Sequence, residues 1–191
     1  MKHSITILSF FSFLLIYSCS NGQSSTQENS EYHSIEDYNP SDELIRFPLE
    51  NYEIGDDFCY LNKKGDTIIP YGKYSVSYSD TIKTFGIVLA KNSDDLIGIN
   101  QKDQRLYEIQ WYDNGPDYIK EGLFRILRNG KTGYADNSGR IVIEPQFECA
   151  YPFLDGKAKV ANQCQKLKLN EHTTTESNKW FYIDKKGNKL K

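Results

Sequence analysis

The stretch Thr132–Phe147, TGYADNSGRIVIEPQF, decides the expected fold of this chain. It combines an alternating segment, a polar turn that ends at Gly139, a β-branched segment, and then Pro145 and an aromatic residue. Gly takes the positive φ angle of a type I turn with a bulge at no steric cost, because it lacks a Cβ atom. The stretch therefore predicts two antiparallel strands joined by a tight hairpin.

The same pattern recurs at three other places. Each copy contains a large apolar residue, termed the anchor, and the anchors are Tyr60, Ile99, Tyr134 and Tyr182. They are separated by 39, 35 and 48 residues, lengths typical of one supersecondary unit that buries its apolar face against its neighbours. Three anchors are followed five residues later by a turn glycine, and these glycines are Gly65, Gly139 and Gly187. The second copy has Gln104 at this place, so we expect its turn to be built differently.

A further strand is expected before the anchor. In the third copy residues 122–127, which are mainly apolar apart from Arg125, lead into Asn129-Gly130, a strong signal for a two-residue hairpin. Residues 86–90 and 157–161 are the counterparts in the second and fourth copies, whereas the first copy has no evident one. We therefore predict an all-β chain of tandem antiparallel three-stranded meanders, which form a curved open sheet or a partial propeller.

These residues resemble the WG-containing repeat of bacterial proteins. The matching segments are Pro145–Phe147 and Pro152–Val160, and the resemblance covers about residues 58–191. The Trp-Gly pair itself is altered in every copy, to Phe58-Cys59, Ile97-Gly98, Thr132-Gly133 and Trp180-Phe181. The resemblance implies a repeat scaffold and no defined chemistry.

The N-terminus has the order of a secretory signal. A basic start precedes Ile5–Tyr17, whose thirteen residues are too few for a helix that spans a bilayer. The segment Leu15–Cys19 resembles the bacterial lipobox, which implies that residues 1–18 are a signal peptide and that Cys19 carries a lipid such as palmitate. The alternative is an ordinary signal peptide with a chance cysteine.

Residues 19–41 are expected to follow the lipid as a flexible tether, because they are polar and nearly without aliphatic side chains. Residues 42–191 then form the repeat domain with its four copies. The residue after Cys19 is not Asp, so nothing resembles an inner-membrane retention signal, and we expect an outer-membrane protein that faces the periplasm.

Composition excludes several functional classes. Without Lys2, the chain has 22 basic and 26 acidic residues and a formal charge of −4, which argues against nucleic acid and anionic lipid headgroups as partners. Outside the signal peptide, histidine occurs only at His33 and His172, and neither belongs to a catalytic or metal-binding motif. We therefore expect no enzymatic activity, no cofactor and no metal site.

Three cysteines remain after lipidation of Cys19. Cys149 and Cys164 could close a 15-residue loop with a disulfide, which would contribute about 3 kcal/mol. Cys59 occupies a small-residue position and is expected to be a buried thiol. The alternative is that all three thiols are free.

We expect a non-catalytic envelope lipoprotein whose WG-like repeats mediate contact with another protein or an envelope polymer. The polar insertion Lys166–Ser177 is expected to be an exposed loop suited to specific contacts. Trp111 aligns with Phe147 and is expected to pack between repeats. Two alternatives are a carbohydrate- or small-ligand-binding lipoprotein, which requires several aromatic residues exposed on one face, and an inhibitor such as an immunity protein.

Overall fold

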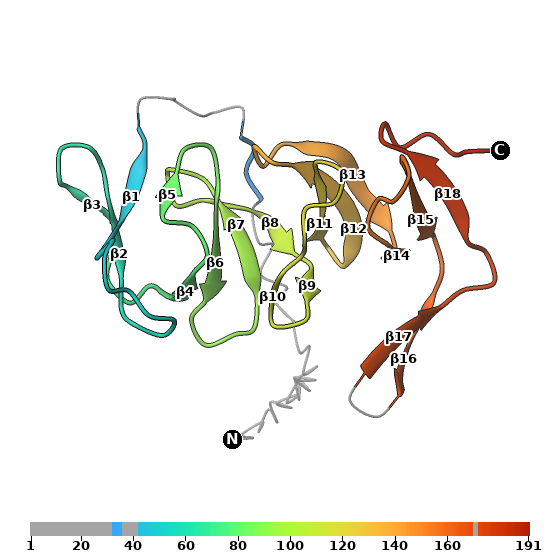
Figure 1. The fold of residues 1–191 in the computed structure, drawn as a ribbon, viewed down its shortest axis with the longest axis horizontal. Helices are drawn as coiled ribbons and strands as arrows, with labels where there is room; N and C mark the ends of the chain where they lie inside the picture. Colours follow the sequence, from blue (N-terminus) through green and yellow to red (C-terminus); the bar gives the residue numbers. More distant parts are fainter. Residues whose placement is uncertain (1–31, 36–41, 170–171) are drawn as a thin grey trace, which may run out of the picture. The chain divides into compact units, whose positions relative to one another are not determined.

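The computed structural model describes residues 32–35, 42–169 and 172–191. Every regular element in these residues is a β-strand, every strand pair is antiparallel, and none of the sheets closes on itself (Figure 1). The expectation of an all-β chain of antiparallel repeats is therefore confirmed. In the described ranges there is no helix with the length and apolar character needed to cross a membrane.

The repeat unit consists of a first, a second and a third strand, which pair in that order. The first unit contains β1 (Leu44–Phe47), β2 (Cys59–Leu61) and β3 (Thr67–Ile69), and the second contains β6 (Gly86–Ala90), β7 (Leu96–Ile99) and β8 (Arg105–Ile109). The third contains β11 (Leu123–Arg128), β12 (Lys131–Asp136) and β13 (Ile141–Phe147). The fourth contains β15 (Lys157–Ala161) and β18 (Phe181–Asp184), with a bridge from Ile183 to Lys189 in the place of the third strand. The first unit thus has the preceding strand, β1, that its sequence did not reveal.

Consecutive units are joined by strand pairing. The first strand of each later unit pairs either with the last strand of the unit before it or with a short strand that follows that unit. These partners are β4 (Tyr74–Ser77) for β6, β8 for β11, and β14 (Cys149–Ala150) for β15. The remaining short strands are β5 (Thr81–Ile82), which pairs with β1, and the two ribbons β9 (Trp111–Tyr112) with β10 (Gly115–Pro116) and β16 (Gln165–Leu169) with β17 (His172–Glu176).

All four units use the same turn after the second strand. The first residue of each turn is Asn or Asp, and its Oδ1 atom accepts hydrogen bonds of 2.8–3.0 Å from the backbone N–H groups two and four residues later. These first residues are Asn62, Asn100, Asp136 and Asp184. The fourth residue of each turn has a positive φ angle, and these residues are Gly65, Asp103, Gly139 and Gly187. A few residues are enough to specify the turn, because the short Asn or Asp side chain accepts hydrogen bonds from nearby backbone N–H groups.

The shared turn corrects the alignment of the second copy by one residue. Counting back two residues from the start of each turn gives Tyr60, Tyr134 and Tyr182, but in the second unit it gives Gly98 rather than Ile99. The second turn is also not built differently, because Asp103 has a φ angle of 60° and takes the place of the glycine. Asp is one of the few residues other than Gly that adopts this conformation readily.

Tyr107 compensates for the missing side chain at Gly98. The two residues are register partners on β7 and β8, and a Cβ atom at Gly98 would lie 2.6 Å from the Tyr107 ring. The Tyr107 hydroxyl donates a hydrogen bond of 2.8 Å to the carbonyl oxygen of Gly139, in the turn of the third unit. One side chain therefore fills the space of the absent anchor and links two units.

The fourth anchor is also corrected. Tyr60 and Tyr134 are buried and donate hydrogen bonds to Ser79 O and Tyr151 O, in the segments that follow their units. Burial raises the pKa of Tyr60 to about 12. Tyr182 instead is 45% exposed, and its neighbour Ile183, 0% exposed, enters the core. The reason is that the segment after the fourth turn pairs along the edge of β18 rather than covering its outer face.

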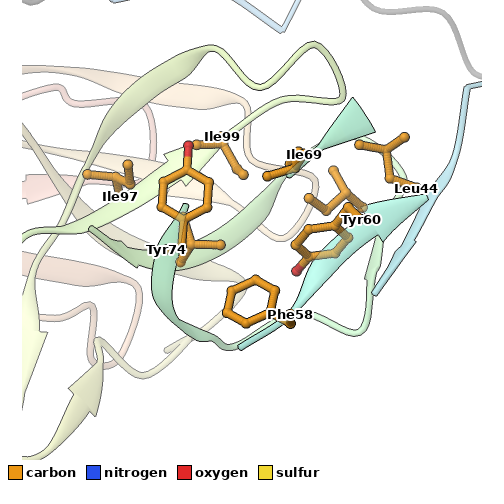
Figure 2. Close-up of a cluster of buried hydrophobic side chains, with 9 residues drawn as sticks. Leu44, Phe58, Tyr60, Ile69, Tyr74, Ile97 and Ile99 are labelled. Atoms are coloured by element: carbon orange, nitrogen blue, oxygen red, sulfur yellow. The ribbon is translucent and has the colours of Figure 1, made fainter. Parts of the chain in front are cut away.

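Each hydrophobic cluster is shared by two neighbouring units. Figure 2 shows the cluster between the first and second units, which contains Leu44, Phe58, Tyr60, Ile69, Tyr74, Ile97 and Ile99. The cluster between the second and third contains Leu96, Leu106, Ile109, Phe124, Ile126 and Ala135. The cluster between the third and fourth contains Leu123, Tyr134, Ile143, Ala158, Val160 and Ile183. The units therefore bury their apolar side chains against each other, as a repeat architecture requires.

Candidate functional site

The fourth unit presents an outer face that its core does not use. Along β15, Ala158 and Val160 point into the cluster shared with the third unit, so Lys157 and Lys159 point outward. Tyr182 on β18 is the register partner of Lys159 and lies on the same outer side. Alternation along two paired strands thus places two lysines beside an exposed aromatic ring.

Two further aromatic side chains extend this surface. Tyr151 follows β14, is 42% exposed, and its backbone N–H donates to Lys159 O at 2.9 Å. Its ring centroid lies 5.4 Å from that of the half-buried Trp180, with 56° between the ring planes. We term these five residues, Tyr151, Lys157, Lys159, Trp180 and Tyr182, the aromatic–lysine face.

Both lysines of the aromatic–lysine face lie over aromatic rings. The Lys159 ammonium group is 4.9 Å from the Trp180 ring centroid and 5.8 Å from that of Tyr151. The Lys157 ammonium group is 5.1 Å from the Tyr182 centroid. These are cation–π distances, which hold the flexible lysine side chains near the rings while leaving the ammonium groups able to contact an anion.

A polar cavity of about 610 Å³ adjoins the aromatic–lysine face at Trp180. The lining contains amides, hydroxyls and one carboxylate, from Gln163, Gln165, Thr175, Glu176, Ser177 and Asn178, together with Cys164 and Trp180. The Ser177 hydroxyl donates to Gln163 O at 2.6 Å and accepts from the Lys179 backbone N–H at 3.1 Å, which closes the base of the β16–β17 ribbon. The cavity thus combines one aromatic wall with several groups that can donate and accept hydrogen bonds.

A disulfide joins Cys149 and Cys164 in the structure, with 6.2 Å between their Cα atoms. Cys149 begins β14, and Cys164 lines the cavity next to Trp180, so the bond ties the base of the β16–β17 ribbon to the sheet. Cys59 is a buried free thiol, as expected from its small-residue position.

Charge is distributed unevenly along the chain. The residues from Cys149 to the C-terminus include nine lysines and four carboxylate side chains, whereas the preceding 148 residues contain 14 basic and 22 acidic residues. The aromatic–lysine face therefore lies in a basic part of an acidic protein. Such an asymmetry favours a negatively charged partner at the basic end.

The structure also describes a short piece of the expected tether. The His33 N–H donates to Arg105 O at 2.9 Å, and Arg128 Nη2 donates to His33 O at 3.1 Å. The Tyr32 ring lies 5.6 Å from the guanidinium of Arg105 and 5.3 Å from that of Arg128, and its hydroxyl donates to Glu108 at 3.1 Å. Residues 32–35 are thus held on the sheet rather than free. Cys19 and the signal peptide lie outside the described residues.

Trp111 and the polar insertion, which the sequence singled out, are both part of the folded scaffold. Trp111 is half-buried, packs against the cluster shared by the second and third units, and donates its indole N–H to Asp94 O at 2.6 Å. The insertion Lys166–Ser177 is not a loop but contains most of the β16–β17 ribbon, whose residues pair in register from Gln165 with Glu176 to Leu169 with His172. Across the described ranges, no group of three or more His, Cys, Asp and Glu residues could hold a metal ion.

Sequence reasoning missed one buried ion pair. Arg125 Nη2 and Nε lie 2.5 and 2.9 Å from the carboxylate oxygens of Asp117, whose side chain is 1% exposed. A third donor, Arg125 Nη1, reaches Ala150 O at 3.1 Å. The ion pair joins β11 to the segment that leads into the third unit, and the bond to Ala150 O joins β11 to β14. No local pattern reveals the pair because its partners come from a strand and a loop.

Comparison with known families identifies one repeat in the C-terminal half of the chain. Residues 133–162 match the family described as WG containing repeat. The chain carries a WG-containing repeat. The match covers β12 from Gly133 onward, β13, β14 and β15, so it runs from the third unit into the fourth. No curated protein and no solved structure matches the chain.

Proposed function

We propose that this protein is a non-catalytic lipoprotein of the cell envelope, whose WG-repeat scaffold binds another protein or an envelope polymer. The lipid is attached at Cys19, and the protein is placed in the outer membrane facing the periplasm. The N-terminal sequence supports the anchor and the location. The aromatic–lysine face supports the binding role.

The aromatic–lysine face carries this proposal because its side chains lie outside the core cluster of the fourth unit. The fourth unit fills its core from the opposite side, with Ala158, Val160 and Ile183. The outward side chains nevertheless include three large aromatics and two lysines in place of small polar residues. Aromatic side chains gathered on an exposed surface are typical of sites that contact a partner.

A binding role also fits the chemistry of the titratable groups. The described tyrosines with strongly raised pKa values, Tyr60, Tyr74, Tyr107 and Tyr134, owe the shift chiefly to burial and belong to the core clusters or contact them. They support packing rather than proton transfer. The placement of these tyrosines therefore fits a protein that binds a partner through its outer face better than it fits a catalyst.

The binding proposal is tested by capture from intact envelopes with the full-length tagged chain. The test variant is Tyr151→Ala with Trp180→Ala and Tyr182→Ala, and the matched control replaces exposed aromatics elsewhere, Tyr71→Ala with Tyr112→Ala and Tyr118→Ala. We expect the test variant to lose partners that the wild type and the control variant retain. If both variants capture the same partners as the wild type, the aromatic–lysine face is not the binding surface.

The anchor is tested separately by metabolic labelling with a fatty acid. The wild type should incorporate the label and fractionate with membranes, whereas Cys19→Ala should do neither. Absence of label in the wild type would refute the lipid anchor without affecting the binding proposal.

A further inference from the structure

Building on the proposed function, we propose that the aromatic–lysine face and the adjoining polar cavity bind a polysaccharide that carries carboxylate groups. Three properties of this region lead to this class of partner. They are the mixture of flat rings and hydrogen-bonding groups, two lysines that form no ion pair with a described residue, and a sheet edge that is already occupied.

The first property is the chemistry around Trp180. This ring belongs both to the aromatic–lysine face and to the cavity wall, and the Tyr151 ring stands beside it. A sugar ring presents C–H groups on its faces and hydroxyls on its rim, so it matches an aromatic plane that is surrounded by amides and hydroxyls. Gln163, Gln165 and Asn178 supply such groups within the cavity.

The second property is the set of contacts that the two lysine ammonium groups form. Lys157 and Lys159 lie over aromatic rings, and neither forms an ion pair with any residue that the structure describes. Two nearby lysines behave differently, since Lys131 pairs with Glu148 and Lys185 pairs with Glu121, whereas Lys189 also lies over a ring, 4.8 Å from the Phe181 centroid. The lysines of the aromatic–lysine face are thus positioned to pair with anionic groups of a ligand, as carboxylates on a sugar chain would provide.

The third property argues against an extended acidic peptide. Such a peptide commonly binds by adding a strand to an open sheet edge. The outer edge of β18 is already occupied, because Leu190 N–H donates to Tyr182 O at 2.8 Å and Ile183 bridges to Lys189. A ligand that contacts β15 and β18 must therefore bind across their outer face, which suits a chain of rings.

The test measures binding of the full-length chain, purified in detergent, to three soluble probes. Polygalacturonic acid is a carboxylated sugar polymer, dextran is a neutral one, and polyglutamate is an acidic peptide. We expect binding to polygalacturonic acid in preference to both others. Raising the salt concentration should weaken this binding in part, because salt screens the lysine contribution but not ring stacking.

Two substitutions connect the binding to the structure. Trp180→Ala and Lys159→Gln should each weaken binding to polygalacturonic acid about tenfold, as for residues at the centre of an interface. Trp180→Phe should retain most of the affinity, and Tyr118→Ala, at an exposed ring outside the site, should leave it unchanged. Thermal unfolding of each variant shows whether the fold is kept.

The outcomes separate this inference from the proposed function. Equal binding to polyglutamate and polygalacturonic acid would show that charge alone is recognised and would overturn the inference. Unchanged binding of folded Trp180→Ala would do the same. If none of the probes binds while capture of envelope partners still depends on Trp180, the inference fails and the proposed function stands.

Discussion

Replacing Gly133 by alanine tests the strand geometry at the centre of the repeat. Gly133 lies on β12 where the pairing with β13 shifts register, between the pairs formed by Thr132 and Tyr134. A Cβ atom at Gly133 would lie against Ile143 O, 2.6 Å from Pro145 N. Both atoms belong to the backbone of β13, which cannot rotate away as a side chain does. The bulge would have to open for the methyl group to fit.

The expected loss of stability depends on which atoms neighbour the added methyl group. Overpacking in a well-packed region costs about 1–3 kcal/mol, and backbone neighbours place Gly133→Ala near the upper end, at about 3 kcal/mol. For a domain of this size, a loss of about 3 kcal/mol in the free energy of unfolding corresponds to a fall of about 6–12 °C in Tm. Gly115→Ala is the matched control, because Gly115 has no positive φ angle and a Cβ atom there would lie 3.9 Å from Tyr78. Its expected effect is within about 0.5 kcal/mol of zero.

Urea unfolding followed by fluorescence measures both variants. The same replacement of glycine by alanine restricts the unfolded chain equally in the two cases, so the difference between them reports the clash at the bulge. A Gly133→Ala variant as stable as Gly115→Ala would refute the bulge and its close backbone contact.

Three further predictions concern the core, the disulfide and the turns. Tyr134→Phe should lower the free energy of unfolding by about 1 kcal/mol in urea, because one buried hydrogen bond is lost. Cys149→Ser should lower it by about 3 kcal/mol, the contribution of a 15-residue loop, and mass spectrometry of the non-reduced wild type should find no free thiol at Cys149 or Cys164. Hydrogen bonds from Asn188 lower the pKa of Asp184 in the folded state, so its stabilising contribution is complete above the unfolded pKa of about 3.9 and is lost as the pH falls further. Urea midpoints should therefore decrease below about pH 4 in the wild type and less steeply in Asp184→Asn; equal slopes would contradict this.

Local turn chemistry was the most predictable part of the fold. Gly65, Gly139 and Gly187 all have the positive φ angles expected from their spacing. Asn129-Gly130 likewise joins β11 to β12 with positive φ angles at both residues, as its two-residue signal predicted. These features depend on a few consecutive residues and their own backbone, so the order of residues is sufficient to predict them.

Register was harder to predict when two neighbouring residues were both plausible. In the second unit, Ile99 is apolar and buried, so it was a reasonable anchor, yet the turn places Gly98 there. The deciding contact is Tyr107 from the next strand, which covers Gly98. A compensation of this kind depends on a pairing across two strands and has no signal within the motif itself.

The amino-acid sequence by itself determined that this protein is built from repeated antiparallel hairpins, because turn residues and alternating side chains act over a few positions. Only the tertiary structure decided which side of each strand is buried in the last unit. Tyr182 and Ile183 are both large residues that favour strands, and the cluster shared with the third unit selects Ile183. Tyr182 is consequently exposed beside Lys157. The aromatic–lysine face exists because the opposite side of the fourth unit packs against the third unit.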